Sequence, residues 1–390
     1  LPIDLNKNYK KGSGIQINKS SSIFKLNNEL DFDSSWNIIE KAIDDKLFPG
    51  AQVMIIKGSD ILADKSFGRL TFDNNSELVN NETIYDVASL TKVIATTPVI
   101  MKLIKKKYLN LNHEVYQFYP EFRGEWKDKV TIKHLLTHSS GLKPYIQYFK
   151  DSKYKKKEDI VYDIILNQEL IYEPGVDSKY SDLGMILLMD ISEKVTGRKF
   201  EELVRAWVLN PLDMNNSFFN PSKDLFYKIA PTEEDYIFRD TLVHGVVHDE
   251  NAFIMGGVSG HAGLFSNASD IANYAQMMLN LGLYNGKRIF SRRSISKFTK
   301  RQNTPVSSDF ALGWDTPSRK GNSAAGDFFS NNSYGHLGFT GTSFWVDSEQ
   351  EIIIILLTNR IHPSRDKKGM YQLRRSFHNE VMTTIKNRGV

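Results

Sequence analysis

The run Ile352-Ile353-Ile354-Ile355-Leu356-Leu357 is the strongest apolar stretch of the sequence and decides the predicted fold. Its length suits a strand buried on both faces, within a strand pattern over 351–357, and falls short of the ~18–20 apolar residues of a membrane span. Strand patterns also cover 343–346, just before it, and 51–56 and 61–67, around the hairpin signal Lys57-Gly58-Ser59-Asp60. Strands are therefore expected at both ends of the chain.

Helical periodicity fills the middle of the chain. Apolar residues recur at helical spacing over 93–105, 183–195, 200–208 and 271–281, and two outer helices are expected at 36–43 and 370–386. This order predicts an α/β (α+β) fold, with a mainly antiparallel sheet from both chain ends, flanked by helices and carrying an inserted, mostly helical region.

The same order of elements predicts the domain organisation. We expect a sheet domain made of 31–88 and 310–390, a helical region over 89–309 with the active site at the junction, and an extended polar arm over 1–30. The chain starts without Met and shows no signal peptide pattern, which is expected for a processed or trimmed form.

The composition sets limits on function. The 390 residues, 41% of them hydrophobic, suffice for a sizeable core, and the absence of cysteine excludes disulfides and thiolate chemistry. A net charge of +4 is too small to indicate nucleic acid binding. The lysine-rich runs 105–107 and 153–157 indicate a solvated surface or, alternatively, attraction to an anionic envelope polymer or membrane surface.

The segment Ser89-Leu90-Thr91-Lys92 is the first candidate for catalysis. It follows the apolar stretch 84–88 and opens an apolar helix, so the free N–H groups of a helix start favour negative charge at Ser89. Lys92, three residues on, lies over the same helix face. It activates the hydroxyl as a base only if burial or nearby cations lower its pKa. The alternative is an N-cap serine beside a solvated lysine.

Two later segments add candidate groups. Tyr180-Ser181-Asp182 opens the expected helix 183–195 and places a phenol at its start, although Asp182 as a helix N-cap with Tyr180 in the core is also possible. The segment Gly335-His336-Leu337-Gly338-Phe339-Thr340-Gly341 runs into a strand. Its glycines indicate close approach of the backbone to a ligand and an N–H for an oxyanion, or else a glycine-rich turn.

In this order, the Ser-x-x-Lys, Tyr-x-Asp and His-x-Gly motifs resemble those of the penicillin-binding proteins and serine β-lactamases. The likeness is to the class C branch, which includes penicillin-binding esterases and D-Ala carboxypeptidases, and it spans 51–360. The segments 134–142, 247–252 and 256–264 resemble the same branch. The resemblance implies a β-lactamase/transpeptidase-like fold.

The resemblance also implies the roles of individual residues. Ser89 would become acylated, and Lys92 and Tyr180 would move its proton and then activate water. The backbone N–H groups of Ser89 and Phe339, next to Gly338, would bind the oxyanion. His336 would replace the cation of the third motif, and would steer an anionic substrate or tune the Tyr180–Lys92 pair.

Two residues depart from the family pattern. Asp182 stands where Asn is usual, and its carboxylate would stabilise the charged form of Lys92. Leu337 stands where many members have a hydroxyl that helps to bind a carboxylate. We therefore expect weak β-lactamase activity at most. The substrate is expected to be a cell-wall D-Ala peptide or a small ester or amide, and β-lactams are possible acylating ligands.

The resemblance further implies a periplasmic or envelope location and no cofactor. A catalytically silent protein that binds penicillin or muropeptides as a sensor or scaffold is the alternative, although Ser89, Lys92 and Tyr180 are all present. A catalytic metal is a second alternative, because His134 and His138 stand four residues apart and further metal-ligand side chains cluster nearby (His244, His248, Asp249, Glu250 and His261). Histidines that hydrogen-bond loops at the crevice rim would explain the same pattern.

Overall fold

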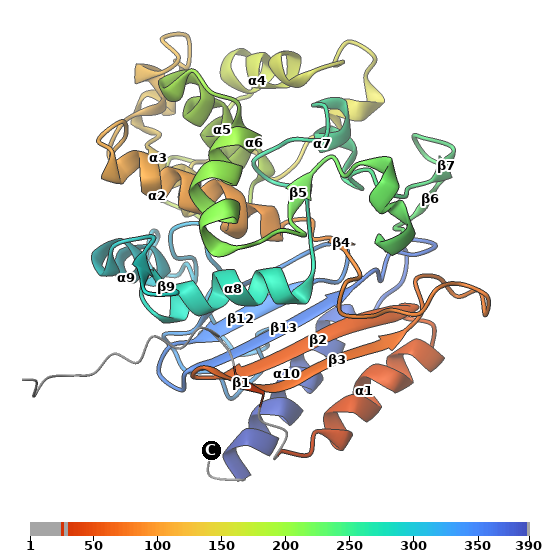
Figure 1. The fold of residues 1–390 in the computed structure, drawn as a ribbon. Helices are drawn as coiled ribbons and strands as arrows, with labels where there is room; N and C mark the ends of the chain where they lie inside the picture. Colours follow the sequence, from red (N-terminus) through yellow and green to blue (C-terminus); the bar gives the residue numbers. More distant parts are fainter. Residues whose placement is uncertain (1–24, 27–29, 388–390) are drawn as a thin grey trace, which may run out of the picture.

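A six-stranded sheet forms the base of the molecule, in a computed structural model that describes residues 25–26 and 30–387 (Figure 1). Its strands lie in the order β1 (Lys25–Leu26), β3 (Asp60–Gly68), β2 (Gly50–Lys57), β13 (Ile352–Thr358), β12 (Ser343–Asp347) and β11 (Tyr334–Leu337). All neighbouring pairs are antiparallel except β1 with β3. The sheet thus joins both ends of the chain, which confirms the predicted fold class.

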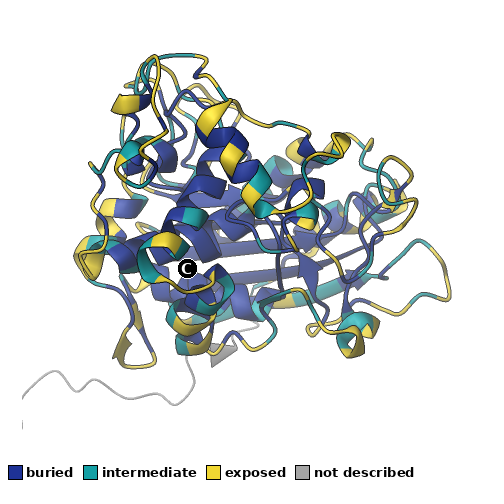
Figure 2. Cartoon of the chain, turned by 90° about the horizontal axis from the view of Figure 1, so that it is seen from above, coloured by how far each residue is buried: buried dark blue, intermediate teal, exposed yellow. Residues whose placement is uncertain are grey.

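The side chains of the central strands alternate between two cores, because successive residues of a strand point to opposite faces. In β13, Ile352, Ile354 and Leu356 pack into the core on one face, and Ile353, Ile355 and Leu357 pack into the core on the other. The prediction of a strand buried on both faces is confirmed. In Figure 2 the sheet and the inner sides of the helices are buried, and exposure is concentrated in the outer loops.

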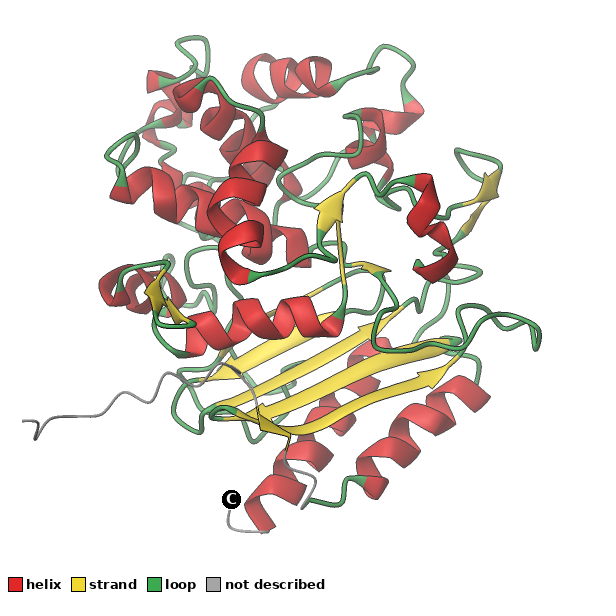
Figure 3. Cartoon of the chain, in the orientation of Figure 1, coloured by secondary structure: helices red, strands yellow, loops and turns green. Residues whose placement is uncertain are grey.

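Helices cover both faces of this sheet (Figure 3). The helices α1 (Asp33–Asp44) and α10 (Met370–Asn387) lie together on one face, and α8 (Ala268–Leu279) lies on the other. All three confirm predicted helices. The helix α8 belongs to the range 89–309, which was expected to form the helical region, yet it packs on the sheet. The predicted domain boundaries stay a prediction. The arm residues 1–24 and 27–29 lie outside the described residues.

The rest of the chain forms a second, mostly helical layer beyond α8. Its α-helices are α2 (Thr97–Lys105), α3 (Ile132–Leu136), α4 (Lys157–Leu166), α5 (Asp182–Thr196), α6 (Phe200–Val204) and α7 (Glu250–Ile254), whereas α9 (Arg292–Thr299) lies at the level of α8. Two expected helices, 93–105 and 200–208, are each divided by a π-helical segment, Lys92–Thr96 before α2 and Arg205–Leu209 after α6. Short 3-10 helices lie at Val115–Gln117, Lys127–Lys129, Tyr148–Lys150, Asn210–Leu212 and Lys223–Lys228.

Small sheets lie outside the six-stranded sheet. They pair β4 (Tyr85–Asp86) and β5 (Phe218–Phe219) with β8 (Leu264–Ser266), β6 (Glu234–Asp235) with β7 (Thr241–Leu242), and β9 (Leu283–Tyr284) with β10 (Lys287–Arg288). Within residues 25–26 and 30–387, no helix has the length and apolar character needed to cross a membrane.

Candidate active site

Ser89 lies at the boundary between the sheet and the helical layer, three residues after β4. Ala88 just before it has a φ of +47°, a left-handed conformation that strains any residue with a side chain. The Asp86 side chain holds this turn, because its Oδ1 accepts a hydrogen bond of 2.8 Å from the Ala88 N–H. A constrained turn therefore presents Ser89 at the start of the helix that carries Lys92.

Lys92 is fully buried and contacts three acceptors with its Nζ. The ammonium donates to Ser89 Oγ at 2.9 Å and to the His261 carbonyl at 3.0 Å, and pairs with Asp182 Oδ1 at 2.8 Å. Three acceptors match the three protons of an ammonium. The expected reach of Lys92 to Ser89 is present, and the π-helical turn brings the amine there.

The pKa of Lys92 is raised in this setting. Burial lowers the pKa, but the interaction with the Asp182 carboxylate and then that with Tyr180 outweigh burial and favour the charged form. This direction agrees with the expected effect of the Asp182 carboxylate, and the role of Lys92 as the base stays a prediction. The physical reason is the carboxylate at the position where the family usually has Asn.

Tyr180 stands directly before α5, where its ring contacts both Lys92 and His138. The Lys92 Nζ lies 4.8 Å from the centre of the phenol ring, and the His138 ring centre lies 4.7 Å from it. Burial raises the pKa of Tyr180 more than the Lys92 charge lowers it. The phenol is thus neutral in the resting site, although both Lys92 and Ser89 favour its ionised form.

Two histidines beside Tyr180 are neutral. Burial and the Lys92 charge lower the pKa of His138 to about 3 and that of His336 to about 3. The His138 Nδ1 accepts a hydrogen bond of 3.1 Å from the Ser181 N–H, which fixes the start of α5. The His336 ring lies 5.8 Å from that of Tyr180. His336 is therefore uncharged near neutral pH, and its two expected roles, steering an anionic substrate or tuning the Tyr180–Lys92 pair, stay predictions.

The turn between β11 and β12 is joined to the segment before Ser89. Thr340 Oγ1 donates to the Asp86 carbonyl at 2.8 Å, and Thr342 Oγ1 donates to the Val87 carbonyl at 3.1 Å. A Cβ on Gly338 would lie 2.7 Å from the Val87 oxygen, so only glycine fits there. Among the described residues, no acceptor is found for the N–H of Ser89 or of Phe339. These two donors suit an oxyanion.

Two cavities meet at Ser89, Tyr180 and Phe339. The larger, the basic pocket, has a volume of about 590 Å³ and is lined by His336 and Leu337 and by cations of the C-terminal part of the chain (Arg360, Lys367, Lys368 and Arg374). The smaller, the acidic pocket, has a volume of about 300 Å³ and is lined by carboxylates (Asp182, Asp249 and Glu250), together with Arg365. The structure thus gathers all predicted site residues (Ser89, Lys92, Tyr180, Asp182, His336, Leu337, Gly338 and Phe339) around one place.

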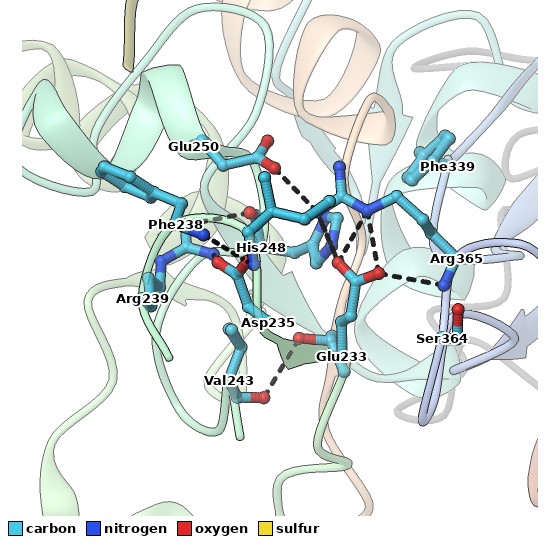
Figure 4. Close-up of polar contacts among 12 residues, drawn as sticks. Glu233, Asp235, Phe238, Arg239, Val243, His248, Glu250, Phe339, Ser364 and Arg365 are labelled. Carbon is cyan, nitrogen blue, oxygen red and sulfur yellow. Dashed lines mark hydrogen bonds and ion pairs between the residues drawn. The ribbon is translucent and has the colours of Figure 1, made fainter. Parts of the chain in front are cut away.

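A charged network behind the acidic pocket was not predicted (Figure 4). Arg365 donates through Nε to both oxygens of Glu233, at 2.8 and 2.7 Å, and through Nη2 to Glu250 at 2.7 Å. His248 Nε2 lies 2.8 Å from Glu233, and its backbone N–H donates to Asp86 Oδ2 at 2.7 Å. The network therefore supports the same aspartate that holds the turn before Ser89. Arg365 lies more than a hundred residues from both Glu233 and Glu250, and no sequence spacing indicates these two contacts.

Within residues 25–26 and 30–387, no group of three or more histidine or carboxylate side chains is placed to hold a metal ion, as the alternative of a catalytic metal would require. Each histidine of the cluster has another partner: His244 contacts backbone carbonyls, His248 contacts Glu233, and His261 Nε2 lies 2.9 Å from Asp249. This arrangement corresponds to the alternative in which histidines fix loops around the crevice.

The chain is similar to a family of known proteins over most of its length. A family profile described as Beta-lactamase matches residues 37–378. The chain is 33% identical to an N-acetylmuramyl-L-alanine amidase of Bacillus subtilis, over 81% of this chain and 78% of the relative, and 32% identical to a putative D-alanyl-D-alanine carboxypeptidase of Salmonella agona, over 81% and 79%. It superposes on an octameric penicillin-binding protein homologue of Pyrococcus abyssi with a TM-score of 0.68 and 26% identity, over 88% of this chain and 77% of that one.

Proposed function

The chain belongs to the beta-lactamase family, and from this premise we propose that it hydrolyses an amide or ester through an acyl-Ser89 intermediate. The observation that carries the proposal is the contact of Lys92 Nζ with Ser89 Oγ at 2.9 Å at the meeting point of two cavities. Ser89 Oγ attacks the carbonyl carbon, the amine or alcohol leaves, and water then releases the acid. The N–H groups of Ser89 and Phe339 receive the negative charge of the carbonyl oxygen.

The proton of Ser89 passes, in this proposal, through Lys92 to Asp182. The resting ammonium of Lys92 has no free lone pair, so it must give a proton to Asp182 as it accepts the proton of Ser89. Charge balances, since Ser89 loses one proton, Asp182 gains one and Lys92 stays an ammonium. The same proton returns from Asp182 through Lys92 to the leaving group, and Tyr180 bridges to that group.

The substrate class follows from the relatives. Their names include an amidase and a carboxypeptidase of cell-wall components. We infer that this chain acts on a cell-wall peptide or a related small ester or amide, and that it works in the periplasm or cell envelope. β-Lactams would acylate Ser89 with little turnover, because a charged Lys92 opposes activation of the deacylating water and Leu337 lacks the hydroxyl that helps many members to bind a carboxylate.

Hydrolysis of p-nitrophenyl butyrate by the wild type and by Ser89→Ala at neutral pH tests the mechanism. Turnover by the wild type and none by the variant is the expected result. The substitution removes one oxygen at the surface of a cavity, so equal melting temperatures serve as the folding control. Equal activity of the two proteins would overturn the assignment of Ser89.

A silent binding protein is the second candidate, and the Lys92–Asp182 ion pair favours it, because a charged Lys92 opposes activation of Ser89 and of the deacylating water. A fluorescent penicillin separates the candidates. A label that persists on Ser89, together with no hydrolysis of any ester, supports the silent protein. A label that is lost with time, or turnover of an ester, supports the hydrolase.

A further inference from the structure

The described residues give Lys92 Nζ three acceptors, and only one of them stays unchanged during the proposed reaction. Ser89 Oγ becomes acylated and Asp182 takes up a proton, so both change as acceptors. The His261 carbonyl, 3.0 Å from Nζ, takes no part in bond making or proton transfer. It is therefore the acceptor that holds the amine in place throughout the reaction.

This carbonyl belongs to the segment 259–264, which is joined to the helix that follows the nucleophile. Thr96 Oγ1 donates to the Gly260 carbonyl at 2.6 Å, and the Leu264 N–H donates to Thr91 Oγ1 at 3.2 Å. These bonds lie on either side of the contact with Lys92 in the sequence. The segment is thus fixed along the π-helical turn.

The same segment packs closely against α5, which begins at Asp182. A Cβ on Gly260 would lie 2.1 Å from the Met185 carbonyl oxygen, so this approach requires glycine. Because α5 presents the Asp182 carboxylate to Lys92, the segment contacts both helices that supply the ion pair.

The His261 side chain ties this segment to the wall of the acidic pocket. Its Nδ1 lies 2.8 Å from Ser259 Oγ and its Nε2 lies 2.9 Å from Asp249 Oδ1, so both ring nitrogens have a partner. An imidazole with its proton on Nε2 donates to Asp249 and accepts from the Ser259 hydroxyl. Asp249 is itself anchored at the start of α7, where its Oδ1 accepts from the Ala252 N–H at 2.8 Å. The ring thus fixes the residue whose carbonyl contacts Lys92.

Ser259, His261 and Asp249 have the residue types of a catalytic triad but do not form one. In a triad the serine contacts Nε2 and the aspartate contacts Nδ1, whereas here the two nitrogens are exchanged. Ser259 is fully buried and is not among the described residues that line either cavity. A substrate carbonyl does not reach its hydroxyl, so these three residues act on the site through Lys92.

The other titratable groups that face Lys92 come from several elements. Burial lowers the pKa of Lys92, while Asp182 and then Tyr180, at the start of α5, raise it and prevail. Burial, and then the Lys92 charge, lower the pKa of His138, after α3, and that of His336, in β11, to about 3 each. A carbonyl dipole directed at Nζ adds to the groups that favour the ammonium. Loss of that dipole therefore makes Lys92 easier to deprotonate.

We propose that His261 is a positioning residue for Lys92, and that its bonds to Ser259 and Asp249 hold the carbonyl that keeps the amine charged and directed at Ser89. This inference rests on the proposed hydrolase function and adds how its proton relay is held. Asp249 lines the acidic pocket, so the wall of that pocket and the relay form one connected unit.

Labelling of Ser89 by a fluorophosphonate probe between pH 6 and pH 11 tests the proposal, because the label requires an activated serine but no deacylation. We expect His261→Ala to be labelled about 10- to 100-fold more slowly than the wild type, as expected for a displaced relay group. The pH at which its rate changes should lie about one unit lower, since the ammonium has lost an acceptor. The direction of this shift is the same whether loss of the Lys92 proton speeds or slows labelling.

Two graded variants and a matched control accompany this measurement. His261→Gln keeps an amide N–H that reaches Asp249 and should recover part of both losses, and Ser259→Ala, which removes only the partner of Nδ1, should give a smaller shift in the same direction. His378→Ala is the control, because His378 is similarly buried and its Nδ1 lies 2.8 Å from the Ala324 carbonyl on the other side of the sheet. It should lower the melting temperature and leave the pH dependence of labelling unchanged.

The outcomes separate the positioning role from a merely structural one. Slow labelling of His261→Ala with the pH dependence of the wild type would overturn the proposal, and so would labelling at the wild-type rate. If His261→Ala does not fold, His261→Gln and Ser259→Ala decide by the same shift.

Hydrolysis of p-nitrophenyl butyrate, measured alongside, tests the hydrolase separately. If the wild type is labelled but turns over no ester, the hydrolase proposal fails and the pH shift still decides the role of His261. If the wild type is neither labelled nor active, Ser89 is not activated and both proposals fail.

Discussion

Lys92 Nζ and Asp182 Oδ1 lie 2.8 Å apart, next to the Oγ of Ser89. The lysine is fully buried and the aspartate side chain is 18% exposed, so the pair lies between the interior and the cavity. The ion pair with Asp182 keeps Lys92, the ionisable group that contacts Ser89 Oγ, in its charged form. It also makes the Asp182 carboxylate the nearest group that can accept, through Lys92, the proton of Ser89.

Asp182→Asn is expected to lower kcat for p-nitrophenyl butyrate by about 10²- to 10³-fold, in the range of a lost general base. The amide cannot take the proton that Lys92 must give up. If Asp182 instead only suppresses a lysine base, the substitution lowers the pKa of Lys92 and kcat rises. The sign of the change in kcat therefore decides between the two roles, with Glu173→Gln at an exposed ion pair as the control.

Lys92→Met is expected to lower kcat by at least about 10³-fold, nearly as much as Ser89→Ala, because groups of one proton relay act as a unit. The variant also leaves Asp182 without its cation, which should reduce the free energy of unfolding by about 1–3 kcal/mol. Steady-state rates and urea denaturation measure the two effects. Near-normal activity of this variant would remove Lys92 from the mechanism.

Glu233→Gln should reduce the free energy of unfolding by about 2–4 kcal/mol at pH 7, because Arg365 and His248 lose a buried carboxylate. Burial alone would raise the pKa of Glu233, but the hydrogen bonds from His248 and Arg365 lower it to about 2. A carboxyl with a lowered pKa stabilises the fold above its ordinary pKa, and this stabilisation is lost as pH falls from about 4.5 toward 2. The difference between wild type and variant should therefore shrink in acid.

The exposed neighbour Glu234→Gln is the matched control for this measurement, and its effect on stability should be within about 0.5 kcal/mol. A Glu233→Gln variant as stable as the wild type at pH 7 would show that the network contributes no net stability. Activity should also fall in this variant, since His248 connects Glu233 to the aspartate that holds the turn before Ser89.

Asp315→Asn should stabilise the protein increasingly as pH rises from about 4 to 7. The folded pKa of Asp315, about 7 through burial, lies above its unfolded value, so the folded state resists ionisation and stability is lost as pH rises. The gain at pH 8 should be on the order of 2–4 kcal/mol. Melting temperatures across pH 4–8 measure it, with Asp366→Asn on the surface as the control. A difference that does not depend on pH contradicts the raised pKa.

Most of the sheet could be predicted from the sequence, since its strands carry a local signal. The run 352–357 and the hairpin 51–67 are apolar enough, and short enough, to exclude other structures, and the structure confirms them. The strand β11 was missed because its four residues include a glycine and adjoin a glycine-rich turn. The π-helical turn at Lys92–Thr96 has no periodicity that distinguishes it from an α-helix.

The residues of the site and the effect of Asp182 on the charge of Lys92 could be expected from the sequence, but the distances behind that effect and the charge state of His336 could not. The motifs indicated Ser89, Lys92 and Tyr180, whereas the sign of the Lys92 pKa shift depends on how π-helix and α5 pack, which fixes a distance of 2.8 Å. The same holds for His336, whose neutral state comes from burial. Arg365 and Glu233, 132 residues apart, meet only through the tertiary fold.

The central place of β13 in the sheet sets the order in which this site is completed during synthesis. β13 pairs with β2 on one side and β12 on the other, so the sheet stays open until residues 352–358 have left the ribosome. The turn that carries Phe339 is joined to the segment before Ser89 and cannot dock earlier. A nascent chain therefore holds its serine without the second oxyanion donor until residues 352–358 have emerged and paired in the sheet.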